Sequence, residues 1–158
     1  MPGPDKTEIK LPIHFSNYRE LYLFMAKYEG IPTSADAVFQ FAADSETEIY
    51  TLDELPSYVW VIMPHFFNGG IFDEIRGAQG NGSIYLVHPL ARNFASDDTN
   101  RGFELIGIAE GNAYRFASIN QIPRLITNWH ISAGEHPESI YEWNGKFFAQ
   151  LPPDKSSP

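Results

Sequence analysis

The alternation of apolar and polar residues is clearest between Arg124 and Phe148, where it predicts a β-meander. Arg124–Ile131 is rich in the aromatic and β-branched residues that strands favour. Ser139–Trp143 alternates between two faces, as a half-buried strand does. Asn144-Gly145 then predicts a hairpin, because a type I′ turn needs positive φ at both central residues. Residues 146–148 are expected to return as the partner strand, and the rest of the chain to pack against this meander.

Further strands are predicted upstream of the meander. Tyr58–Met63 is a continuous apolar run, which is typical of a central strand buried on both faces. Glu48–Leu52 and Ser83–His88 have short strand-like patterns. Phe103–Ala109 and Ala113–Ser118 flank a Glu-Gly-Asn turn, so we expect them to pair with each other.

One helix is predicted, at Asn17–Tyr28. Its first residue can cap it, Glu20 completes a capping box, and Gly30 ends it. Residues 34–43 fit a short helix or a strand equally well, and the sequence leaves both alternatives open. Residues 44–48 are expected to form a polar turn.

These elements predict an α+β fold in which a mainly antiparallel β-sheet carries one N-terminal helix on one face. At 158 residues the chain fits a single domain by size. We expect a mobile lead-in over residues 1–12, a globular domain over 13–151 and a polar tail over 152–158.

Composition limits the chemistry and the environment of the protein. Apolar residues make up 43% of the chain, enough for a packed core, and the absence of cysteine excludes disulfides and thiolate catalysis. No apolar run reaches the length of a membrane-spanning helix. The first residues lack the pattern of a signal peptide. The expectation is therefore a cytoplasmic protein, or a periplasmic or secreted one from which a leader has been removed.

The net charge of −9 is unevenly distributed. Residues 28–75 contain no lysine or arginine, and the remaining residues hold eleven acids and eleven bases. The span 28–75 itself contains nine acids: Glu29, Asp36, Asp44, Glu46, Glu48, Asp53, Glu54, Asp73 and Glu74. Such a field repels nucleic acid and anionic membranes. Two interpretations stay open, a solvated acidic face and a docking face for a basic protein.

The best candidates for chemistry lie close to one another in the sequence. His130, Glu135 and His136 could converge with Ser132 or Ser139 in a hydrolase site. The spacing does not match the H-E-x-x-H metal motif, and a triad is defined by geometry, not by order along the chain. The sequence therefore predicts no metal site and no cofactor, and it retains these residues as candidates for catalysis.

Two further segments are candidates for binding. Asp44, Glu46 and Glu48 place three carboxylates at alternate positions, but a calcium loop would need glycine and glutamate where Ile49 and Leu55 stand. Aromatic side chains beside a glycine-rich turn form either core or a contact patch, and such side chains occur here at His65, Phe66 and Phe67.

The final hairpin has a partial family resemblance. The residues that carry it fit the pattern Y-x-W-x-G-K-x-F and are Tyr141, Trp143, Gly145, Lys146 and Phe148. Residues 119–148 thereby resemble the closing strands of FG-GAP-like β modules of bacterial envelope proteins. Residues 120–123 depart from that family, because they replace its aspartate-rich calcium loop. The resemblance implies an exported, β-rich binding module and transfers no active site.

Taken together, these features favour a non-enzymatic binding protein, of an inhibitor or immunity type, whose acidic segment meets a basic protein partner. The alternative is a hydrolase that uses His130, Glu135 and His136. The oligomeric state has no signature in the sequence.

Overall fold

The structure is a computed structural model, and it describes residues 9–52, 55, 58–64, 82–90, 102–129 and 137–152. Within these ranges the chain forms two helices and nine strands. In chain order they are β1 (Ile13–Phe15), α1 (Tyr18–Tyr28), α2 (Ala35–Asp44), β2 (Glu46–Thr51), β3 (Tyr58–Met63), β4 (Gly82–Pro89), β5 (Phe103–Gly111), β6 (Ala113–Ile119), β7 (Ile122–Asn128), β8 (Glu138–Trp143) and β9 (Phe148–Gln150).

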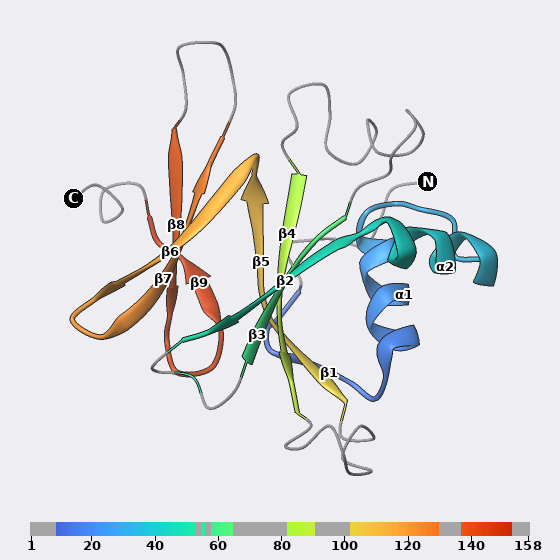
Figure 1. The fold of residues 1–158 in the computed structure, drawn as a ribbon, viewed down its shortest axis with the longest axis horizontal. Helices are drawn as coiled ribbons and strands as arrows, with labels where there is room; N and C mark the ends of the chain where they lie inside the picture. The colour runs from blue at the N-terminus through green and yellow to red at the C-terminus, as the bar shows by residue number, and fades with distance from the viewer. Residues whose placement is uncertain are drawn as a thin grey trace.

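The strands form two antiparallel sheets. One has five strands in the order β1-β5-β4-β3-β2, and the other has four in the order β6-β7-β8-β9. The two helices pack on one face of the five-stranded sheet, and the four-stranded sheet packs on the other face (Figure 1). The prediction of an α+β fold with mainly antiparallel sheet is confirmed.

The five-stranded sheet is therefore buried on both faces. We call the layer between this sheet and the helices the helix-side core, and the layer between the two sheets the inter-sheet core. Along β3, Trp60 and Ile62 belong to the helix-side core, whereas Val59 and Val61 belong to the inter-sheet core. This explains why the run is apolar without alternation, and it confirms the predicted strand at Tyr58–Met63.

The helix α1 begins as predicted. The Asn17 side chain accepts a hydrogen bond from the backbone N–H of Glu20 at 3.0 Å, and the Glu20 carboxylate accepts one from the N–H of Ser16. These bonds satisfy N–H groups that have no partner inside the helix. Upstream, Ile9 and Leu11 of the predicted lead-in pack against the helix-side core.

The prediction of a single helix needs correction, because α2 is a second one. Ser34 caps it by accepting a hydrogen bond from the N–H of Ala37. Its buried apolar residues, Val38 and Phe41, are three positions apart, which is a helical spacing. The alternative left open at residues 34–43 is thereby decided in favour of a helix.

The predicted polar turn at residues 44–48 is also wrong. Asp44 ends α2, and β2 begins at Glu46 and pairs with β3 over its whole length. Residues with low strand propensity are tolerated here because they lie on an edge strand, where their side chains reach water.

The predicted pairing of residues 103–109 with 113–118 is wrong as well. β5 pairs with β4 and β1, whereas β6 pairs with β7 in the other sheet. The chain changes sheets at Gly111, where a Cβ would lie 2.9 Å from the Cβ of Thr127. The N–H of Asn112 then donates to the carbonyl of Asn128 at 2.7 Å, which directs the chain into the second sheet.

The hairpin at Asn144-Gly145 is present, but its turn is longer than predicted. Trp143 pairs with Phe148, so four residues form the loop. Gly145 has a φ of 97°, and the Asn144 side chain accepts hydrogen bonds from the N–H groups of Lys146 and Phe147. This is an Asx-type turn and not a type I′ turn. No helix in the described ranges is long and apolar enough to cross a bilayer.

Candidate interaction surface

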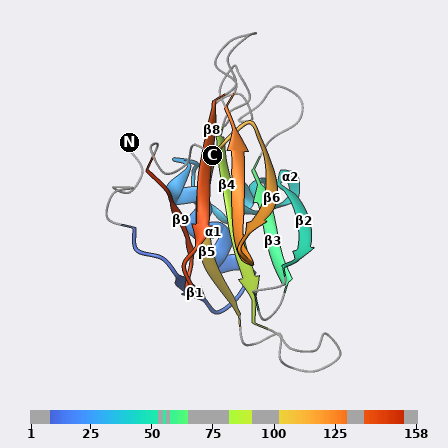
Figure 2. The ribbon, with the colours of Figure 1, turned by 90° about the vertical axis from the view of Figure 1, so that its left-hand side faces the viewer.

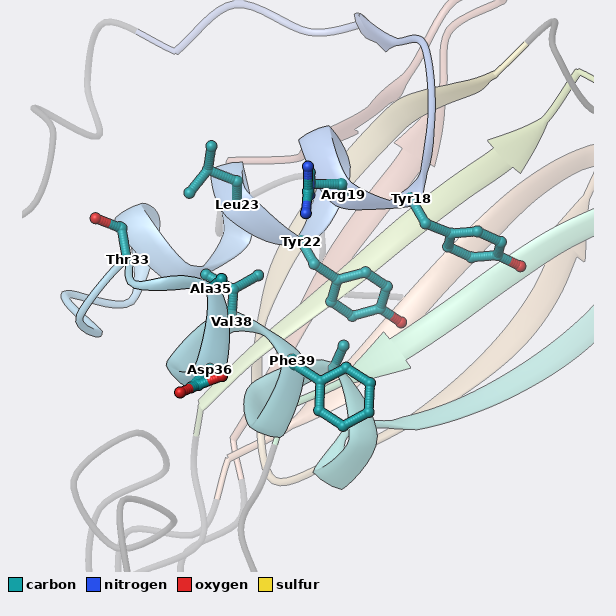
Figure 3. A pocket seen from close by; sticks show the side chains of 10 residues that line it. Tyr18, Arg19, Tyr22, Leu23, Thr33, Ala35, Asp36, Val38 and Phe39 are labelled. Carbon is teal, nitrogen blue, oxygen red and sulfur yellow. The ribbon is translucent and has the colours of Figure 1, made fainter.

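A groove with a volume of about 650 Å³ lies between α1 and α2. Its walls combine aromatic, aliphatic and charged side chains from both helices. They include Tyr18, Arg19, Tyr22, Leu23, Asp36, Val38 and Phe39. Figure 3 shows the rings of Tyr22 and Phe39 directed to the same end of the groove and Asp36 toward the other end. The groove thus offers an apolar surface with one acid and one base on its walls.

Large apolar side chains are exposed at and beside this groove. The exposed fraction is 74% for Phe39, 51% for Tyr18 and 60% for Ile49 on β2. Phe39 points outward because Val38 and Phe41 direct the other side of α2 into the core. The Tyr18 ring stacks on Trp60 with a centroid separation of 5.6 Å, which fixes it in place. Clustered exposed apolar side chains mark interaction sites more often than isolated ones do.

Carboxylates lie on the same two elements as Phe39 and Ile49. Asp36 lines the groove, and Asp44, Glu46 and Glu48 follow on α2 and β2. The Asp44 carboxylate accepts a hydrogen bond from the Gln40 side chain at 2.8 Å, and the Glu46 and Glu48 side chains are exposed. The three carboxylates predicted to bind therefore lie on a helix end and on the strand that follows it, and not in a turn.

The side chains of β2 alternate between two surroundings. Thr47 hydrogen-bonds to the Tyr22 side chain on the helix side. On the opposite side, Glu48 accepts a hydrogen bond from the Tyr114 hydroxyl at 2.5 Å, and the Tyr50 and Tyr114 hydroxyls lie 2.8 Å apart. Burial and these hydrogen bonds raise the pKa of Tyr114, so the hydroxyl stays protonated and remains a donor. This link fixes β2 against the second sheet.

Charges on the outer face of the four-stranded sheet form ion pairs. Arg115 forms an ion pair with Glu138 at 2.8 Å, and Arg124 forms one with Glu142 at 2.7 Å. Arg115 is also the main cause that lowers the pKa of Glu138. An exposed pair such as Arg115–Glu138 contributes little stability, but both pairs neutralise the local charge. Of the nine acids in residues 28–75, those that the structure describes are Glu29 and, on α2 and β2, Asp36, Asp44, Glu46 and Glu48.

A second polar cluster lies at the C-terminal end of α1. The Glu29 carboxylate accepts hydrogen bonds from Ser83 at 3.0 Å and Tyr85 at 2.8 Å. Burial, with a contribution from Glu110 and Glu29, raises the pKa of Tyr28 to about 12. The hydroxyls act as donors to a carboxylate, so the cluster holds the helix end on β4 and provides no activated nucleophile.

A row of polar residues that was not predicted crosses three strands. Glu104 on β5 is opposite His14 on β1 and His88 on β4. Burial lowers the pKa of His88, and Glu104 acts in the opposite direction. The signal is absent from the sequence because strand register alone brings these residues together. Among the described residues, no group of three or more histidines and acids is arranged to hold a metal ion.

The other candidates fall outside the ranges that the structure describes. These are His130, Glu135 and His136 of the hydrolase hypothesis, and His65, Phe66 and Phe67 of the predicted contact patch. The groove was missed because its outline depends on whether residues 34–43 form a helix or a strand.

No family model, no curated protein and no solved structure matches this chain. The resemblance of residues 119–148 to FG-GAP-like modules therefore stays a prediction, and the function is argued from the surface alone.

Proposed function

We propose that this chain is a non-enzymatic binding protein whose acidic face docks a basic protein partner. The binding face comprises the groove between α1 and α2 together with β2. Occupation of a partner's basic surface is how an inhibitor or immunity-type protein acts, and we assign the chain to that class.

One observation carries the proposal: exposed apolar side chains and carboxylates occupy the same two elements. Phe39 and Asp36 are on α2, and Ile49, Glu46 and Glu48 are on β2. An apolar centre with charged surroundings is the usual anatomy of a protein interface. The carboxylates would steer a basic partner, and the exposed side chains would supply buried contact area.

The test begins with capture of partners from an extract of the native host, followed by measurement of affinity with the purified partner. Two variants probe the face, Phe39→Ser and the triple variant Asp44→Asn/Glu46→Gln/Glu48→Gln. The matched control, Asp5→Asn/Glu8→Gln/Asp154→Asn, removes the same charge from the two ends of the chain.

We expect a partner rich in lysine and arginine whose affinity falls in both face variants. A loss of at least about 1 kcal/mol for Phe39→Ser would be typical of an interface anchor. Equal affinity of wild type, both face variants and control would refute the acidic docking face.

A further inference from the structure

We infer that the partner adds an extended segment to the outer edge of β2, with alternating basic and apolar side chains. This inference rests on the proposed function and specifies how the basic partner is recognised. In this mode of binding, main-chain hydrogen bonds provide the affinity and the pattern of side chains provides the specificity.

The outer edge of β2 has the properties of a strand acceptor. β2 is the last strand of the five-stranded sheet, and no other strand in the described part of the chain pairs with its outer side (Figure 2). All six of its residues are in continuous register with β3, without a bulge. The strand contains no proline, glycine or lysine. Proline, lysine and bulges are common means by which edge strands avoid pairing, and within β2 itself only the charged glutamates serve that purpose.

The two faces of β2 dictate the pattern of the added strand. Glu46 and Glu48 project toward the side of the second sheet, where Glu48 meets Tyr114. Thr47 and Ile49 project toward the helices, where Thr47 meets Tyr22. An added strand follows the same alternation at a spacing of about 4.8 Å. Its basic side chains would therefore lie beside the glutamates and its apolar side chains beside Ile49.

Charge excludes a second copy of the chain as the occupant. Two β2 strands paired at their edges would bring four glutamates together, and like charges on neighbouring strands are destabilising. A basic strand reverses this sign, because each lysine or arginine can pair with Glu46 or Glu48. The exposed Ile49 would be covered in the same step.

The experiment uses the full chain and two blocked octapeptides of alternating lysine and valine. The second peptide differs only by N-methylation of two adjacent central amides, which removes a donor from each edge of the strand. The readouts are the dissociation constant and the hydrogen exchange of the backbone amides of residues 46–51. The protein variants are Glu46→Gln/Glu48→Gln and the charge-matched control Asp5→Asn/Glu8→Gln, and amide spectra verify that both are folded.

The unmodified peptide should bind and slow exchange at the outward amides of β2 by about elevenfold at ten times its dissociation constant. The N-methylated peptide should bind at least about tenfold more weakly. Loss of the two glutamates should weaken binding by between about twofold and thirtyfold, and the control variant should not.

Equal binding of the two peptides, or binding without protection of β2, would overturn strand addition. So would a failure of the unmodified peptide to bind. A purified partner that still depends on the acidic face would then preserve the proposed function. A partner indifferent to that face would refute the proposed function independently of the peptides.

Discussion

Single aromatic side chains connect the layers of this molecule, and Trp60 is the best example. Its side chain is 9% exposed, and its ring contacts Tyr18 and Phe103 at centroid separations of 5.6 and 5.3 Å. It thereby links α1 to the five-stranded sheet. Its burial follows from the continuous apolar run of β3, which is a local signal that the sequence contains.

Replacement of this side chain should strongly destabilise the fold. We expect Trp60→Ala to lower the free energy of unfolding by about 3 to 5 kcal/mol, because a large cavity would remain in the helix-side core. Urea melts of wild type and variant measure the difference. Tyr18→Ala is a suitable comparison, because that ring is half exposed and should cost less. A loss below about 1 kcal/mol for Trp60→Ala would contradict its place in the core.

Burial of His88 should make the stability depend on pH. Its pKa is lowered in the folded state, so the unfolded chain binds more protons at mildly acidic pH. This contribution to stability is complete above the unfolded pKa near 6.5 and is lost as the pH falls through the folded pKa. We therefore expect wild type to lose more stability than His88→Asn between pH 7.5 and 5.5 in parallel urea melts. Identical losses would contradict the lowered pKa of His88 in the folded state.

At the scale of elements, features set by neighbouring residues could be predicted from the sequence, whereas features set by contacts between distant residues could not. The cap of α1 and the run of β3 depend on neighbouring residues only, and both were predicted. Whether residues 34–43 form a helix or a strand depends on tertiary packing. In a strand Phe39 and Phe41 would share a face, whereas in α2 one is 74% exposed and the other is buried. The groove follows from that difference, so the sequence predicted the carboxylates of the candidate surface but not its apolar part.

Turns show the same limit. The short turn between β5 and β6 predicted that these strands pair with each other. In the structure the chain passes into the other sheet at Gly111, which approaches Thr127 closely. The two-residue hairpin lies instead at Asn120 and Gln121, which join β6 to β7 with φ values of 53° and 68°. Positive φ at both positions is what a type I′ turn requires, but the second position lacks the glycine that makes such turns recognisable.

That missing glycine gives a prediction for the β6–β7 hairpin. A left-handed conformation costs a non-glycine residue about 1 to 2 kcal/mol, and glycine brings an entropic cost of about 0.5 to 1 kcal/mol. Gln121→Gly should therefore raise the free energy of unfolding by about 0.5 to 1 kcal/mol. Ser118→Gly, within β6, is the control and should lower it. Destabilisation by Gln121→Gly in chemical denaturation would contradict the assigned turn conformation.

At the scale of the whole molecule, the three layers separate stability from recognition. The inter-sheet core and the helix-side core bury both faces of the five-stranded sheet. The outer face of the four-stranded sheet carries paired charges, whereas α2 and β2 expose apolar side chains among carboxylates. This asymmetry arises only when the chain is folded, because α2 forms the groove together with α1 and β2 pairs with β3 at the edge of the sheet.

The asymmetry predicts that association with the captured basic partner is steered by charge. The Debye length shrinks from about 30 Å at 0.01 M salt to about 10 Å at 0.1 M, so the association rate should fall by at least about tenfold over that range. Asp44→Asn/Glu46→Gln/Glu48→Gln should associate more slowly at low salt and depend less on salt. The amides retain hydrogen-bond acceptors for Gln40 and Tyr114, so the fold should persist.

Stopped-flow association rates at both salt concentrations measure this effect for wild type, the triple variant and Asp5→Asn/Glu8→Gln/Asp154→Asn. The control removes the same net charge, so it separates the local field of β2 from the charge of the whole chain. Equal rates for the triple variant and the control would mean that net charge alone steers association. Rates that do not change with salt in any of the three proteins would leave the carboxylates of α2 and β2 as a solvated face, because an interface steered by charge must respond to screening.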